Sequence, residues 1–151
     1  MPGNRKAKRK PGSSRVRTFT TAGTLPIIFR TSAEGDRDLK LMPHTELSAL
    51  REGKGNEESY WVVVNRLNWA STLAATIEFS FDPAPVINAA LEALMALHGR
   101  AVDHGKYVFK AEELKAVGEA LTLADDMQDA TSRRQHRDAL VKLVNTLPGN
   151  R

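Results

Sequence analysis

Cysteine is absent from this chain of 151 residues, so disulfide bonds, thiolate metal sites and cysteine nucleophiles are all excluded. Aromatic residues are scarce, at 6% of the chain, which argues against a stacking platform for single-stranded nucleic acid. Apolar and charged residues occur at frequencies ordinary for a globular protein, 41% and 26%. The length suits one domain whose core needs no disulfide or metal to hold it together.

Acidic residues are missing from the first 33 positions, although these hold eight of the 22 Lys and Arg residues. Residues 34–151 hold the other 14 basic residues and all 18 acids, a balance of −4. The net charge of +4 and the isoelectric point of about 9.6 therefore come from the N-terminal segment. We expect this segment to contact a polyanion or an acidic surface.

Residues 1–17 also lack the apolar side chains that would offset the entropy lost when a chain becomes ordered. We therefore predict a disordered basic arm, whose cations can neutralise phosphates without recognising a base sequence. These cations are the first candidate nucleic-acid-binding residues: Arg5, Lys6, Lys8, Arg9, Lys10, Arg15 and Arg17.

A hydrophobic stretch of the kind found in secretory signal peptides does not follow these charges. A mitochondrial presequence has a similar basic composition, but two prolines and two glycines oppose the amphipathic helix that it requires. The most apolar segment later in the chain carries Asn65, Arg66 and Asn68 near its centre, which does not suit a membrane span. We expect a cytoplasmic protein with no membrane partner.

Most of the remaining chain shows apolar residues at the three- and four-residue spacing of amphipathic helices. We predict an all-α, mainly helical fold, a compact bundle of four main helices and one short helix in a single domain over residues 18–151. The predicted helices span residues 44–52, 56–79, 83–104, 110–128 and 132–147.

The segment 110–147 is predicted to form two helices because its two apolar stripes differ in direction by about 150° at the helical repeat. Ser132, followed three residues later by Gln135, is a capping-box pattern at the break. Residues 32–40 are predicted to be a polar loop. Residues 18–31, rich in Thr and apolar residues, suit either a hairpin or an extended strap across the helices.

Side chains with the spacing of a catalytic or metal site are not found. Asp125, Asp126 and Asp129 share one side of a helix, but the simplest interpretation is surface ion pairs such as Asp129 with Arg133. Nucleotide-binding glycine motifs and hydrolase serine motifs are also missing. We therefore predict a protein that is not an enzyme and uses no cofactor or metal. The four histidines are expected to be exposed or packed: His44, His98, His104 and His136.

Arginines cluster where the last helix is predicted to begin. Arg133, Arg134 and Arg137 lie in its first turns, where the helix dipole disfavours cations. Exposed backbone N–H groups beside three guanidinium groups could bind phosphate or carboxylate, although the preceding aspartates could also neutralise them. These arginines are the second set of candidate nucleic-acid-binding residues.

A neutral polar stripe lies on the charge-poor helix predicted over residues 56–79. Four of its side chains fall within about 80° of one another at the helical repeat, and both tryptophans of the chain lie beside them. An ordinary solvent-facing surface would carry Lys and Glu, so this stripe is typical of a surface that another subunit or the N-terminal strap covers. The candidate interface residues are Trp61, Asn65, Asn68, Trp69, Thr72 and Thr76.

Together these features favour a non-enzymatic helical protein that binds DNA or RNA non-specifically through its basic arm and self-associates into a homo-oligomer. The alternative is a protein-interaction adaptor, assembly subunit or inhibitor whose arm docks on an acidic partner. The small size and basic arm would also suit an accessory protein of a phage or mobile element.

Overall fold

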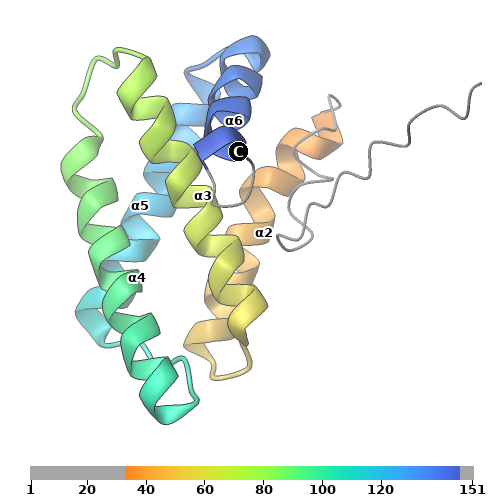
Figure 1. Ribbon diagram of the computed structural model, residues 1–151. Helices are drawn as coiled ribbons and strands as arrows, with labels where there is room; N and C mark the ends of the chain where they lie inside the picture. Colours follow the sequence, from red (N-terminus) through yellow and green to blue (C-terminus); the bar gives the residue numbers. More distant parts are fainter. Residues whose placement is uncertain (1–32, 147–151) are drawn as a thin grey trace, which may run out of the picture.

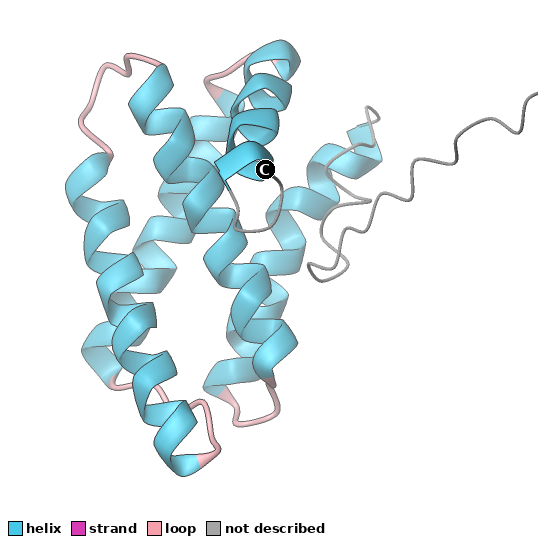
Figure 2. Cartoon of the chain, viewed as in Figure 1, coloured by secondary structure: helices cyan, strands magenta, loops and turns pink. Residues whose placement is uncertain are grey.

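The computed structural model describes residues 33–146, which form a bundle of helices (Figures 1 and 2). This part of the chain contains no strand, which confirms the predicted all-α fold. The basic arm 1–17 and the predicted strap 18–31 lie outside the described residues. The helices are α2 (Ala33–Arg51), α3 (Glu57–Thr76), α4 (Ala84–His104), α5 (Ala111–Asp129) and α6 (Arg133–Thr146).

Helix α3 is the central element of the bundle and packs against α2, α4, α5 and α6 (Figure 1). Its low charge content explains this position, because apolar residues on most of its circumference can be buried at once. Val63 and Leu67 pack in one half of the core against α4 and α5. Trp69 and Leu73 pack in the other half, which α6 closes with Ala139 and Leu140.

Helix α3 begins where the sequence predicts, and it ends three residues before the predicted end. The Asn56 side chain accepts a hydrogen bond from the Ser59 N–H at 3.0 Å, and the Asn56 N–H donates to the Ser59 hydroxyl. The predicted end at residue 79 is wrong, because the backbone is extended at Ile77 (φ −125°, ψ 136°). Ile77 and Phe79 then alternate with exposed Glu78, so the partly buried side chains reach the core from an extended segment.

The predicted break between the last two helices is confirmed by α5 and α6. The Ser132 N–H donates to the Gln135 side chain at 2.9 Å, and the Gln135 N–H donates to the Ser132 hydroxyl at 3.2 Å. Gly105 ends α4 in the left-handed conformation, with φ 72°, and its backbone N–H donates a hydrogen bond to the Ala101 carbonyl. The predicted limits of α4, α5 and α6 agree with the structure within one residue.

The predicted short helix 44–52 and the polar loop before it are wrong. Helix α2 begins at Ala33 and continues through Pro43, which is buried. A proline inside a helix removes one backbone hydrogen bond, a local cost that tertiary contacts can offset. Here the N-terminal half of α2 is held by the Gln128 side chain, which donates to the Asp36 carbonyl at 3.2 Å, and by an ion pair between Lys40 and Asp129.

Candidate functional site

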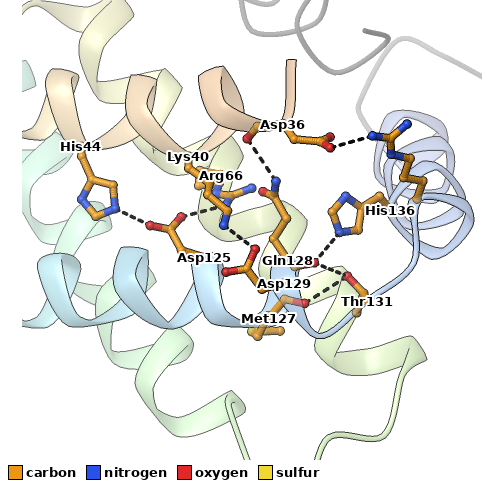
Figure 3. Close-up of polar contacts among 11 residues, drawn as sticks. Asp36, Lys40, His44, Arg66, Asp125, Met127, Gln128, Asp129, Thr131 and His136 are labelled. Atoms are coloured by element: carbon orange, nitrogen blue, oxygen red, sulfur yellow. Dashed lines mark hydrogen bonds and ion pairs between the residues drawn. The ribbon is translucent and has the colours of Figure 1, made fainter. Parts of the chain in front are cut away.

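The start of α2, which is the N-terminal end of the described residues, lies beside the start of α6. An ion pair of 3.5 Å joins the Asp36 carboxylate in the first turn of α2 to the Arg133 guanidinium in the first turn of α6. The Asp36 carbonyl also accepts the Gln128 hydrogen bond from the end of α5 (Figure 3). The fold therefore brings the arginine cluster of α6 beside the start of α2, although the two are far apart in sequence.

All three arginines of the α6 cluster are exposed, but acids partly compensate them. Arg133 is engaged with Asp36, and the Arg134 guanidinium lies 4.0 Å from the Asp138 carboxylate one turn later. Within residues 33–146, Arg137 forms no ion pair. The seven cations of the arm, in contrast, have no acid among them in the sequence.

Two acids of α5 hold two other helices, which corrects the expectation that Asp129 pairs with Arg133. Asp129 instead pairs with Lys40 of α2. The Asp125 carboxylate accepts a hydrogen bond from the Arg66 guanidinium of α3 at 2.9 Å and lies 2.8 Å from Nε2 of His44 on α2 (Figure 3). We call these five residues the polar clamp, because they join α2, α3 and α5.

Arg66 is the most buried charge described, with only 6% of its surface exposed. Burial lowers the pKa of its guanidinium, and the hydrogen bond that it donates to Asp125 opposes that shift. The guanidinium also lies over the Trp69 ring, 4.5 Å from its centroid. Its pairing with Asp125 was not predicted from sequence, although a single charge in a long apolar helix is a signal for a buried ion pair.

The predicted interface stripe on α3 is only partly available. Trp61 is 39% exposed, Asn65, Asn68 and Thr72 are half-buried, and Thr76 is exposed. The hydroxyls of the two threonines donate within α3, to the Asn68 and Thr72 carbonyls.

Trp69 is the exception and corrects the prediction. It is 7% exposed and packs edge-on against the His136 ring of α6, with centroids 5.3 Å apart. The second tryptophan is therefore part of the core, because α6 covers the side of α3 that carries it.

Trp61 belongs to an aromatic cluster at the opposite end of the bundle. The Tyr60 ring stacks on those of His98 and Tyr107, with centroids 5.1 and 5.2 Å away, and its hydroxyl donates to the Leu94 carbonyl. Burial raises the pKa of Tyr60 to about 12. This cluster was not predicted from the sequence, because its members come from α3, α4 and the α4–α5 connection.

Within residues 33–146, no group of three or more His, Asp or Glu side chains is arranged to hold a metal ion. The described helices also include none with the length and hydropathy needed to cross a bilayer. A shallow groove between α4 and α5 is lined by apolar side chains such as Val86 and Leu114 and by the charged side chains of Lys115, Glu119 and Asp126. Comparison with protein-family models, curated proteins and solved structures gives no significant match.

His136 is expected to make the stability of the protein depend on pH. Burial lowers its pKa, and the Arg66 charge adds to this effect, against the opposing influence of the Gln128 carbonyl, Asp36 and Asp129. The unfolded chain then binds a proton more readily than the folded chain. The contribution of neutral His136 to the free energy of unfolding should be fully present above the unfolded pKa of about 6.5. It should be lost as the pH decreases below that value.

Urea unfolding between about pH 7.5 and 5 would measure this effect. His136→Gln should show a smaller loss of unfolding free energy on acidification than the wild type. The control is His104→Gln at the exposed end of α4, which should follow the wild type. Equal acid sensitivity of His136→Gln and wild type would show that this imidazole does not contribute.

Proposed function

We propose that this protein binds nucleic acid non-specifically through its basic arm and that the helical body carries the arm without acting as an enzyme. The observation that supports this proposal is the separation of charge along the chain. Residues 1–33 hold eight cations and no acid, whereas residues 33–146 hold 13 cations and 18 acids. The isoelectric point of the whole chain conceals this separation.

The two parts would behave differently near a polyanion. Lys and Arg side chains in the arm would replace the counterions condensed on phosphates, and the release of these counterions drives binding without sequence recognition. The body, with five more acids than bases, would be repelled from the same phosphates. The arm can therefore contact a nucleic acid while most of the body stays away from it.

The α6 cluster supports the same proposal in a secondary role. Because α6 begins beside the start of α2, we expect Arg134 and Arg137 to contact phosphates near those that the arm binds. Because Asp138 already lies 4.0 Å from Arg134, we expect a smaller contribution from α6 than from the arm.

The alternative is that the arm docks on an acidic protein, as it would in an adaptor, an assembly subunit or an inhibitor. Carboxylates would neutralise the same cations, so charge alone does not distinguish the two partners. The density of charge does, because duplex DNA carries one negative charge per about 1.7 Å of its axis and releases more counterions than a less densely charged polyanion. Competition between DNA and polyglutamate of equal charge is therefore the deciding comparison.

Fluorescence anisotropy with random-sequence DNA and RNA would test the proposal on the full-length chain. Replacing Lys6, Lys8, Arg9 and Lys10 with Gln should weaken binding by about four thousandfold at ~0.1 M salt, since each lost phosphate contact costs about eightfold there. The paired variant Arg134→Gln/Arg137→Gln should cost on the order of tenfold.

Two results would contradict the proposal. One is the absence of binding to any nucleic acid at low salt. The other is displacement of DNA by polyglutamate at equal charge concentration, which would favour the acidic protein partner. Unequal affinity for different DNA sequences would show specific recognition that seven arm cations alone do not explain.

A further inference from the structure

A surface without charge extends across α3 and α4 on one side of the bundle. On α3 it consists of the outward stripe that begins at Trp61. On α4 it consists of a stripe centred on His98, whose ring lies 5.8 Å from that of Trp61 and joins the two helices. At about 100° per residue, the α4 side chains one turn before and after His98 share this side of the helix. We call this surface the neutral face: Trp61, Asn65, Asn68, Thr72, Met95, His98 and Val102.

The neutral face exposes more apolar surface than a helix turned to solvent requires. Met95 is 66% exposed and Val102 is 71% exposed, and Trp61 between the helices is 39% exposed. The only charge from Ser59 to Ile77 is Arg66, which points into the core and binds Asp125. Depletion of charge around exposed aromatic and Met side chains is the composition of the centre of a protein interface.

We propose that the neutral face binds a second copy of this chain. A basic or acidic partner would find no complementary charge on it. The rest of the described body has an excess of five acids, so two copies repel each other wherever their charged surfaces meet. The neutral face is where two bodies can approach with the least repulsion.

The polar residues of the face also suit pairing with themselves. Asn65 and Asn68 are half-buried, and within residues 33–146 their side-chain amides form no hydrogen bond. Each amide carries both a donor and an acceptor, so the same pair of residues on a second copy can satisfy it across a twofold axis. Contact of Met95, Val102 and Trp61 with their counterparts would supply the buried apolar area.

Such a dimer does not depend on the arm, so this inference is independent of the proposed function. If both are correct, the dimer presents two arms, and binding of the second arm becomes intramolecular. The effect of salt distinguishes nucleic-acid binding from dimerisation. Salt should weaken binding of the arm to phosphates. It should not weaken the dimer, because the exposed acids that border the neutral face, Glu57, Glu58 and Glu92, repel their counterparts on the second copy, and salt screens this repulsion.

Sedimentation equilibrium of the full-length chain, without nucleic acid, tests this inference. We expect a monomer–dimer equilibrium that persists when salt is raised and when the four arm cations are replaced with Gln. Asn68→Lys and Met95→Lys should each shift the dissociation constant upward by at least about tenfold, because each buries a charge at the twofold contact. The matched control is Leu41→Lys on α2, at a side chain that is 56% exposed and outside the face.

The inference fails if the wild type is a monomer at high micromolar concentration. It also fails if Asn68→Lys and Met95→Lys dimerise as the wild type does, or if Leu41→Lys weakens the dimer equally. Circular dichroism melts of the three variants show whether each is folded. A dimer that disappears on neutralising the arm would also overturn it, since the contact would then involve the arm.

Discussion

Replacing Asp125 with alanine should lower the free energy of unfolding by about 3 kcal/mol or more, because it leaves a buried guanidinium without its anion. Arg66 is 6% exposed and has Asp125 as its carboxylate partner at 2.9 Å. An unpaired charge in such a position costs far more than an exposed ion pair contributes. The same substitution removes the partner of His44 on α2.

Asp129→Ala is the matched control, four residues along the same helix. The Asp129 side chain is 65% exposed and pairs with Lys40, so its removal should cost less than about 1 kcal/mol. Urea denaturation gives both values. The double variant Asp125→Ala/Arg66→Met should recover much of the loss, because it removes the orphaned charge as well. Equal losses for Asp125→Ala and Asp129→Ala would contradict the assignment of Arg66 as a buried charge.

Trp69→Ala should cost about 3–5 kcal/mol, whereas Trp61→Ala should cost less than about 1 kcal/mol in the monomer. Trp69 is 7% exposed and fills the space between α3 and α6, where its ring contacts His136 and lies under Arg66. Its loss creates a cavity and detaches the side of α6 that covers α3. Trp61 has solvent on one side and loses mainly its contacts with the aromatic cluster.

The comparison uses thermal unfolding at low protein concentration, so that self-association does not contribute. Loss of helical signal from α6 should accompany the destabilisation in Trp69→Ala. A large cost for Trp61→Ala with a small one for Trp69→Ala would mean that the second tryptophan belongs to an interface, as the sequence alone suggested.

Helix spacing and capping could be predicted from the sequence because both depend on neighbours within one turn. Asn56 and Ser132 form the predicted caps, and α4, α5 and α6 lie where their apolar stripes placed them. The start of α2 could not be predicted in this way. Its first half is polar and is followed by Pro43, and the contacts that stabilise it come from residues more than 80 positions away.

The candidate sites show the same division. The placement of Asn65 and Asn68 on one side of α3 followed from the helical repeat, which acts within one element. The burial of Trp69 did not, because it depends on α6 crossing the same side of α3. Likewise, Asp125 differs little in sequence from Asp126, but only a three-dimensional arrangement puts one of them against Arg66.

The central claim is that the arm binds nucleic acid through its charge, and the salt dependence of binding tests it most directly. For the full-length chain, log Kobs for duplex DNA should fall with log salt concentration with a slope of about −6, if all seven arm cations neutralise phosphates. Replacing Lys6, Lys8, Arg9 and Lys10 with Gln should reduce the slope to about −3. A slope that the four replacements leave unchanged would contradict the account, because the bound phosphates would then lie elsewhere on the protein.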